Sequence, residues 1–203
     1  RSSDLPGRGI SMEDGTLVFA SQYIGNDRIP NAGIIYSKDH GKTWNISTLA
    51  RTNTTESQVA EVEPGVLMLN MRDNRGGSRA VSTTTDLGKT WKEHESSRTA
   101  LQEPVCMASL ISVKAKENVL GKDILLFSNP NDAKNRHSIT IKASLDGGVT
   151  WLPENQLLLD AGWGWGYSCL TMIDKETVGI LYESSVAHMT FQAIKLKDII
   201  KTK

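Results

Sequence analysis

Short apolar runs recur along the whole 203-residue chain, and clusters of Gly, Asn, Asp or Pro end each of them. Each run is shorter than ten residues and rich in Val, Ile, Leu, Phe and Tyr, which is typical of β-strands. The pattern predicts strands over residues 16–23, 32–37, 57–63, 66–72, 78–83, 105–113, 123–128, 138–144, 167–173, 177–183 and 189–195. Only the C-terminal KLKDIIKTK has the pattern of a helical turn. The chain is therefore predicted to be all-β.

A motif of the form [S/T]-x-D-x-G-x-T-W occurs at residues 37–44, 84–91 and 144–151. Its Asp can accept hydrogen bonds from backbone N–H groups in a tight turn, and its Gly can adopt the positive φ that other residues resist. Its Trp is expected to be buried, because this removes roughly 150–250 Å² from water. Each motif offers a single carboxylate, whereas a calcium loop needs several oxygen ligands. We therefore interpret the motifs as structural turns.

The spacing of these motifs predicts a repeat architecture. Successive motif tryptophans are 47 and 60 residues apart, close to the roughly 40–50 residues of a four-stranded propeller blade plus insertions. The eleven predicted strands amount to about three blades, and a closed propeller needs at least about four. Residues 1–203 are therefore expected to form part of one larger propeller domain.

Composition excludes several classes of partner. Lys plus Arg and Asp plus Glu both total 23, so the net charge is zero and does not favour nucleic acid or an anionic membrane surface. No apolar run approaches the roughly 18 residues that span a bilayer, so no membrane span is predicted. Cys106 and Cys169 lack the spacing of a zinc site and are interpreted as two small buried hydrophobic residues.

Four segments carry candidate chemistry. Glu56 stands at the start of the strand in TTESQVAEVEPG, and Arg72 closes the apolar run VLMLNMR. Arg136 stands at a loop-to-strand junction in NDAKNRHSITIK, and Tyr167 follows a glycine-rich stretch in GWGWGYSCLT. Arginine is suited to binding a carboxylate, because its planar fork can donate two hydrogen bonds and does not lose its charge. Taken singly, Glu56 and the two arginines could equally be solvated surface charges.

Taken together, the motifs and these four segments resemble the Asp boxes and active-site blocks of bacterial exo-α-sialidases (neuraminidases). The resemblance runs along essentially the whole chain and implies the last three to four blades of a six-bladed propeller. It implies Tyr167 as the catalytic nucleophile, Glu56 as the group that activates it, and Arg72 and Arg136 as two of three arginines that hold the substrate carboxylate. It also implies sialylated glycans as substrates, no metal and no other cofactor. The four residues are expected to converge near the propeller axis.

A tyrosine nucleophile suits this substrate class. Sialic acid carries a carboxylate on its anomeric carbon, so a carboxylate nucleophile about 4 Å away would meet a repulsion of about 4 kcal/mol at an effective dielectric constant of about 20. A neutral phenol avoids this repulsion, but it needs an adjacent base at neutral pH. Sialidases are the noted exception to the paired carboxylates of most glycosidases.

Several residues near these four are not assigned to the site. Arg75 and Arg79 fit the spacing of the family less well than Arg72, and His137 is interpreted as a strand-surface residue. Tyr182 is expected in the core. For the two tryptophans of GWGWGY, a sugar subsite and plain packing both remain open.

The sequence also departs from a complete family member. Arg28-Ile29-Pro30 resembles the motif of the first substrate-binding arginine, but an Asp box follows it too soon, and no Asp stands where the general acid is expected. We therefore expect that arginine and that acid in an upstream, N-terminal half of the propeller. The resemblance further implies a secreted, periplasmic or cell-surface protein.

Two other functions remain open at this stage. A non-catalytic Asp-box propeller that binds glycans or proteins would keep the boxes and lose the set Glu56, Arg72, Arg136 and Tyr167. A glycosidase of another Asp-box family would use paired carboxylates and lack the tyrosine.

Overall fold

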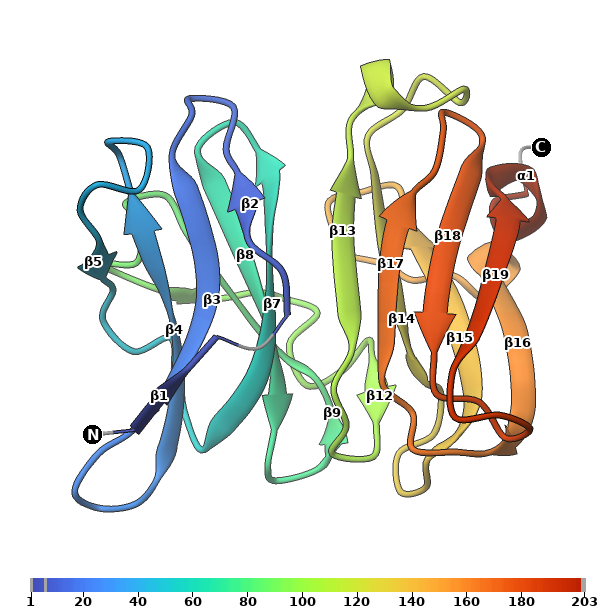
Figure 1. The fold of residues 1–203 in the computed structure, drawn as a ribbon, viewed down its shortest axis with the longest axis horizontal. Coiled ribbons are helices and arrows are strands. Elements are labelled where there is room, and N and C mark those ends of the chain that lie inside the picture. The colour runs from blue at the N-terminus through green and yellow to red at the C-terminus, as the bar shows by residue number, and fades with distance from the viewer. Residues whose placement is uncertain (1, 6, 202–203) are drawn as a thin grey trace.

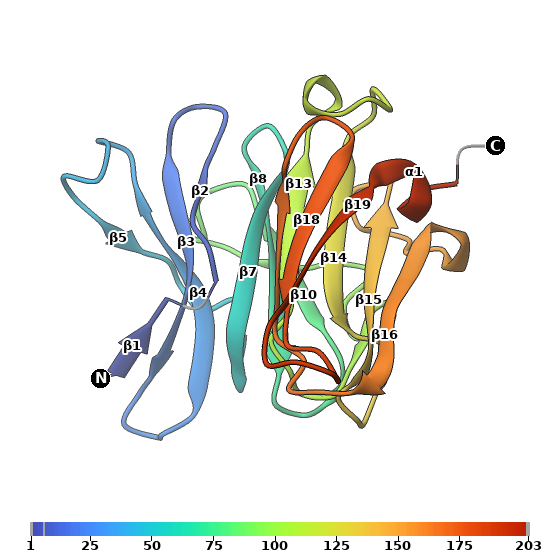
Figure 2. The same ribbon diagram turned by 45° about the vertical axis from the view of Figure 1, so that its right-hand side comes forward.

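Four antiparallel sheets stand side by side in the computed structural model, which describes residues 2–5 and 7–201 (Figure 1). The chain completes one sheet before it starts the next, so the colours run from blue to red across the molecule. Turned by 45°, the sheets fan out like successive blades of a propeller (Figure 2). The predicted all-β class is confirmed.

The first two sheets come from the N-terminal half of the chain. Sheet 1 contains β1 (Ser2–Asp4), β2 (Ile10–Ser11), β3 (Leu17–Ile24), β4 (Pro30–Ser37), β5 (Asn45–Ile46) and β6 (Arg51–Thr52). Sheet 2 contains β7 (Thr54–Glu63), β8 (Val66–Asp73), β10 (Ala80–Thr84) and β11 (Lys92–Glu93). A separate two-stranded ribbon pairs β9 (Gly77–Ser78) with β12 (Gln102–Glu103).

The C-terminal half forms the other two sheets. Sheet 3 contains β13 (Ser109–Val113), β14 (Ile124–Pro130), β15 (His137–Ser144) and β16 (Gln156–Trp163). Sheet 4 contains only β17 (Ser168–Met172), β18 (Thr177–Tyr182) and β19 (Thr190–Lys195). The helical elements are the short turns η1 (Ala115–Glu117), η2 (Pro153–Asn155) and α1 (Leu196–Ile199).

Each sheet packs on the next through its own hydrophobic cluster. The first cluster joins sheets 1 and 2 around Ile34 and Leu69, the second joins sheets 2 and 3 around Met68 and Phe127, and the third joins sheets 3 and 4. These strands are apolar on both faces because a middle sheet is covered on both sides. The packing brings the first strands of neighbouring sheets, β7, β13 and β17, next to one another.

The Asp boxes form the turns that the sequence predicts. In the first box, the Asp39 carboxylate accepts a hydrogen bond from the Thr43 backbone N–H at 2.8 Å, and the box glycine has φ 86°. The other two boxes repeat both features. In the second box, a Cβ on Gly88 would lie 2.4 Å from the Cβ of Ser47, so the glycine also permits close contact between sheets 1 and 2. Residues His40 and Leu87 before the glycines have positive φ as well, which the sequence does not reveal.

The prediction of buried box tryptophans is correct for only one of the three. Trp151 is 7% exposed, but Trp44 is 42% exposed and Trp91 is half-buried. The difference arises because Trp151 lies in the cluster between two sheets, where it meets Phe127, whereas Trp44 packs on Phe19 at the outer side of sheet 1.

Two further expectations need correction. Cys106 is buried as predicted, but Cys169 is exposed, because it lies on the outward face of β17, an edge strand of the three-stranded sheet. The strand predicted over 105–113 begins only at Ser109, since residues 103–106 form a turn instead. The pattern missed β16, which has a half-exposed, irregular apolar pattern, as well as the three-residue β1 and the two-residue strands.

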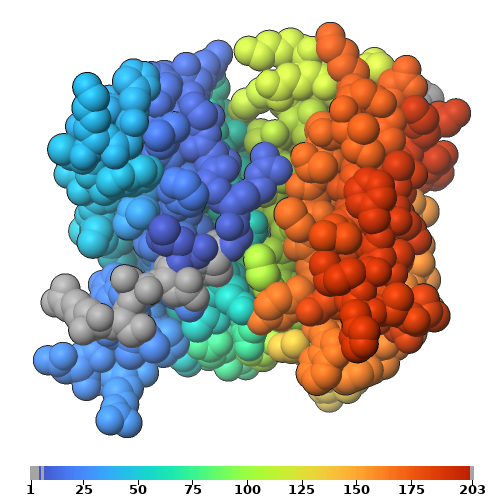
Figure 3. Space-filling view, viewed as in Figure 1, coloured from blue at the N-terminus to red at the C-terminus, as the bar shows by residue number. Residues whose placement is uncertain are grey.

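A groove runs between the N-terminal and C-terminal halves of the molecule (Figure 3). Its main cavity has a volume of about 560 Å³ and is lined by β2, the end of β7 and the end of β13. Arg8 crosses the groove and donates a hydrogen bond to the Leu170 carbonyl on β17 at 3.2 Å. Within residues 2–5 and 7–201, no helix has the length and apolar character to cross a membrane.

Candidate active site

Glu56 owes its position to a break in the ladder between β7 and β8. Thr55 pairs with Arg72 and Ser57 pairs with Met71, so Glu56 is the extra residue of a β-bulge. A bulge bends its strand and turns the side chain of the extra residue away from the regular alternation. The Glu56 carboxylate consequently reaches toward sheet 4 from the start of the first strand of sheet 2.

Tyr167, Glu56 and Arg72 meet through hydrogen bonds. The Tyr167 hydroxyl donates to one Glu56 carboxylate oxygen, and Nη1 of Arg72 donates to the other. The same Arg72 nitrogen lies 3.3 Å from the Tyr167 hydroxyl oxygen. Arg72 and Glu56 side chains are 19% and 21% exposed, so this cluster is shielded from water but remains accessible. The geometry brings together three of the four residues singled out in the sequence.

The Tyr167 phenol is held in its protonated form. Desolvation, the hydrogen bond to Glu56 and the negative charge of Glu56 raise the pKa of Tyr167 to about 12, while the charge of Arg72 opposes the shift. All three raising effects disfavour the charged phenolate form of Tyr167. Proton transfer from Tyr167 therefore has one acceptor already in contact, the Glu56 carboxylate.

The glycine-rich stretch shapes the approach to Tyr167. Gly166 has φ 89°, and a Cβ there would lie 2.7 Å from the ring of Pro130, so a larger residue could not adopt this path. The Tyr167 backbone N–H donates to the Glu183 carboxylate at 2.9 Å, which fixes the chain directly before β17.

Arg136, the fourth residue, lies over the ring of Tyr167. Its Cζ is 5.8 Å from the ring centroid, within the range of a cation–π contact. Two backbone carbonyls hold its guanidinium, Trp165 O at 3.0 Å and Val105 O at 2.9 Å. No acidic group among its hydrogen-bond partners in the described part of the chain neutralises Arg136. The group is thus fixed in direction and keeps its positive charge at the site.

The comparisons with known proteins agree with this geometry. A family model described as BNR repeat-like domain matches residues 3–180. The sialidase of Bacteroides fragilis (strain YCH46) is 78% identical over 196 residues, which are 97% of this chain and 36% of that protein. This chain belongs to the BNR-repeat family of bacterial sialidases. A sialidase of Micromonospora viridifaciens is 34% identical over 152 residues, covering 73% of this chain and 23% of its own length.

Solved structures of sialidases share the fold. The Hadza microbial sialidase Hz136 matches with a TM-score of 0.93 and 74% identity, over 96% of this chain and 38% of that one. A Trypanosoma rangeli sialidase with 22% identity still gives a TM-score of 0.79. The four sheets are therefore part of a sialidase β-propeller. The chain spans little more than a third of the length of the Bacteroides relative.

The neighbouring residues lie as follows in this sialidase fold. Arg75 is exposed and pairs with Asp73 at 3.0 Å, and Tyr182 is buried as expected. His137 is half-buried on β15, with its Nε2 3.4 Å from the Asp132 carboxylate. Arg28 lies in the turn between β3 and β4, with φ 58°.

The two tryptophans of the glycine-rich stretch are exposed, at 62% for Trp163 and 60% for Trp165. Their rings contact each other with centroids 5.6 Å apart. Neither ring is buried in a core of the described chain, and their packing there is the contact with each other. Their use as a sugar subsite stays a prediction.

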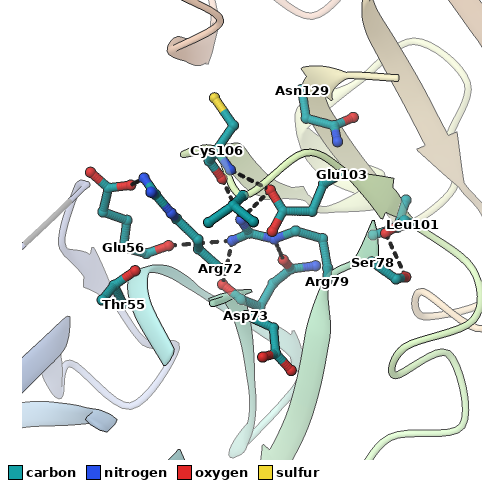
Figure 4. A network of polar contacts seen from close by, with 12 residues as sticks. Thr55, Glu56, Arg72, Asp73, Ser78, Arg79, Leu101, Glu103, Cys106 and Asn129 are labelled. Atoms are coloured by element: carbon teal, nitrogen blue, oxygen red, sulfur yellow. Dashed lines mark hydrogen bonds and ion pairs between the residues drawn. The ribbon is translucent and has the colours of Figure 1, made fainter. Parts of the chain in front are cut away.

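The sequence did not reveal the groups behind the site. Arg79 is completely buried, and its guanidinium contacts Glu56, Asn70, Glu103 and Cys106 (Figure 4). In the sequence, Arg79 and Glu103 are two charged residues near apolar runs, and nothing in that pattern indicates that they are buried and paired. Among the described residues, no cluster of His, Cys, Asp and Glu could hold a metal ion.

Proposed function

We propose that this chain supplies half of the active site of a retaining exo-α-sialidase, which releases terminal α-linked sialic acid from glycans. Tyr167 is the nucleophile, Glu56 is the base that accepts its proton, and Arg72 and Arg136 bind the substrate carboxylate. The observation that carries the proposal is the hydrogen bond between the Tyr167 hydroxyl and the Glu56 carboxylate, made across two sheets.

The pair is suited to attack on an anomeric centre that bears a carboxylate. The phenol approaches without charge, and its proton passes to Glu56 only as the bond to the anomeric carbon forms. Because the pKa of Tyr167 is raised to about 12, its oxygen is a stronger nucleophile once the proton has left than an ordinary phenolate would be. Water then hydrolyses the tyrosyl intermediate, and the two displacements together retain the configuration.

The two arginines are expected to attract the substrate carboxylate and to orient it. Arg136 lies over the Tyr167 ring, and its hydrogen-bond partners in the described part of the chain are backbone carbonyls, so a substrate carboxylate at this position would gain a charge-assisted hydrogen bond. Arg72 bridges from Glu56 toward the same position. A neutral sugar would leave the charge of Arg136 without an acidic partner, which favours an anionic substrate.

The remaining groups come, in this proposal, from the part of the propeller that the longer relatives contain beyond this chain. That part would add a third arginine and the carboxylic acid that protonates the leaving group. Since sialylated glycans are found outside the cytoplasm, we expect the protein to be secreted, periplasmic or at the cell surface.

A chimera tests the proposal. This chain replaces the matching 196 residues of the Bacteroides fragilis sialidase, and the chimera is treated with a fluorinated sialic acid that accumulates the covalent intermediate. We expect hydrolysis of a fluorogenic sialoside, and mass spectrometry should find the label on Tyr167. Tyr167→Phe should abolish labelling, while Tyr36→Phe, which alters another half-buried tyrosine, should not.

The outcomes separate the alternatives. A label on a carboxylate would contradict the tyrosine mechanism. Binding of sialic acid without hydrolysis or labelling would favour a non-catalytic glycan-binding propeller. The chain alone should show almost no turnover, because a general acid typically contributes 10²–10⁴-fold to the rate.

A further inference from the structure

A single buried guanidinium lies behind the candidate site, between the backbone of Glu56 and the turn at residues 103–106 (Figure 4). We propose that Arg79 is a positioning residue that holds the Glu56–Tyr167 pair in register with Arg136. The proposal rests on the function proposed above, and it assigns a role to a residue that touches neither the substrate nor the reacting atoms.

One side of the Arg79 guanidinium holds sheet 2. Its Nε donates to the Asn70 side-chain oxygen at 2.7 Å, and its Nη2 donates to the Asn70 carbonyl at 3.1 Å. The same Nη2 donates to the Glu56 carbonyl at 3.3 Å. Glu56 is the bulged residue, so its carbonyl lacks a regular partner in the ladder of β7 and β8. Arg79 therefore fixes the backbone of Glu56, whose conformation determines the direction of the Glu56 carboxylate.

The other side of the guanidinium holds the turn before sheet 3. Nη1 of Arg79 donates to the Cys106 carbonyl at 2.8 Å and lies 3.7 Å from the Glu103 carboxylate. That carboxylate in turn accepts a hydrogen bond from the Cys106 backbone N–H at 2.7 Å. The two buried side chains thus clamp both polar groups of the Cys106 backbone.

This turn also contains a carbonyl group that binds Arg136, that of Val105. Val105, directly before Cys106, has φ 53°, a left-handed conformation that is costly for a β-branched residue. In this conformation its carbonyl accepts the hydrogen bond from Nη2 of Arg136 at 2.9 Å. The strained residue persists only if its surroundings determine it, and the contacts of Glu103 and Arg79 with Cys106 provide that constraint.

The same turn also contacts the segment that leads into Tyr167. Sγ of Cys106 lies 3.6 Å from the Trp165 carbonyl, which is the second acceptor for Arg136. A Cβ on Gly166 would lie 3.1 Å from that sulfur, so the sulfur and the glycine are in close contact. Through one turn, Arg79 is therefore connected to Glu56, to Arg136 and to the chain that positions Tyr167.

A lysine could not replace Arg79 in this role. The planar fork directs donors to both sheets at once, whereas a lysine ammonium is a single point at the end of a flexible chain. Arg79 is 0% exposed and Glu103 is 0% exposed, so the pair has no access to water that could replace a lost contact.

The test compares two buried basic side chains that both lie near the ring of Phe127. Arg79 Cζ lies 6.0 Å and Lys142 Nζ lies 5.8 Å from the ring centroid, but Lys142 has no contact with the four site residues among the interactions described. Arg79→Lys is the test variant, and Lys142→Met is the matched control for replacing a buried basic side chain. In the chain labelled with ¹³C at tyrosine Cζ, the Tyr167 resonance reports its hydrogen bond to Glu56. Tyr167→Phe assigns this resonance among the four tyrosines.

We expect Arg79→Lys to shift the Tyr167 resonance and, in the Bacteroides chimera, to lower kcat on the order of 10²-fold, as displacements of about 1 Å can do. Lys142→Met should leave both the resonance and kcat unchanged. A folded Arg79→Lys variant with a parental Tyr167 resonance and parental kcat would overturn the proposal. So would an equal change in the resonance for Lys142→Met.

A second variant covers the case in which Arg79→Lys does not fold. Glu103→Gln keeps the shape and the acceptor for the Cys106 N–H but removes the charge that pairs with Arg79. It should also shift the Tyr167 resonance, and an unchanged resonance would overturn the proposal. Because the resonance is measured in the chain alone, failure of the chimera to hydrolyse a sialoside would count against the proposed function and not against the positioning role.

Discussion

Replacing each Asp-box tryptophan with alanine should give unequal losses of stability, although the three residues occupy the same position of the same motif. Trp151 is 7% exposed, packs against Phe127 with ring centroids 5.8 Å apart, and donates from Nε1 to the Gly148 carbonyl at 3.1 Å. Removing such a side chain from a core costs about 3–5 kcal/mol. Trp44 is 42% exposed, so less apolar surface returns to water, and we expect a loss of about 1–2 kcal/mol.

The loss for Trp91→Ala should lie between these values, because Trp91 is half-buried and donates to the carbonyl of Thr48, in the loop between β5 and β6, at 3.2 Å. The assay is urea unfolding of the chain followed by circular dichroism at 25 °C, since tryptophan fluorescence would change with the mutation itself. Equal losses for Trp44→Ala and Trp151→Ala, or a larger loss for Trp44→Ala, would refute the reasoning. Such a result would mean that the local turn, and not burial between sheets, determines what the tryptophan contributes.

Two further predictions concern titration and reactivity. Glu56→Gln should lower the pKa of Tyr167 from about 12 without reaching the ordinary value of about 10, because desolvation is the largest cause of the shift. Because the pKa of Tyr167 is raised in the folded state, the stability that its protonated form contributes is fully present below pH about 10. This contribution is lost as the pH rises toward about 12. Glu56→Gln should narrow the pH range over which the loss occurs. Tyrosinate absorbance, with Tyr167→Phe as the reference, measures the midpoint; an unchanged or higher midpoint would contradict the role of Glu56. In a second experiment at pH about 8, a thiol reagent should modify the exposed Cys169 rapidly, whereas Cys106, whose pKa burial raises to about 11, should react only on unfolding. Two rapidly modified thiols in the folded chain would contradict the described burial.

The fold was predictable to the extent that it depends on local pattern. The long strands such as β4, β8 and β14 bury one or both faces, so each appears in the sequence as an apolar run between turn residues. The blade repeat followed from the box turns, whose Asp and Gly act through their own neighbours. What escaped prediction depends on contacts between sheets. The burial of Trp151 and the exposure of Cys169 and Trp44 depend on what covers each residue.

The candidate site divides in the same way. Glu56, Arg72, Arg136 and Tyr167 could be selected by resemblance to a family, because they stand at fixed places in recognisable segments. The groups that hold these four residues in place could not be identified by resemblance. The bulge at Glu56 depends on how two strands pair, which the sequence of one strand does not show. Arg136 is bound by backbone carbonyls, which every residue has, so no residue type marks their position.

The position of these four residues also explains why the packing of the sheets matters for the site. Glu56 and Arg72 come from sheet 2, Arg136 comes from the loop directly before β15 in sheet 3, and Tyr167 comes from the start of sheet 4. The clusters around Phe127 and Ile141 determine the distances between these sheets. Because a packed core resists small displacements, a substitution in either cluster would move one side of the Tyr167–Glu56 hydrogen bond relative to the other. The network of Arg79 and Glu103 lies at the first of these interfaces and connects it by hydrogen bonds to the backbone of the site. Geometry at the site is therefore determined by the cores between the sheets and by this buried polar network together.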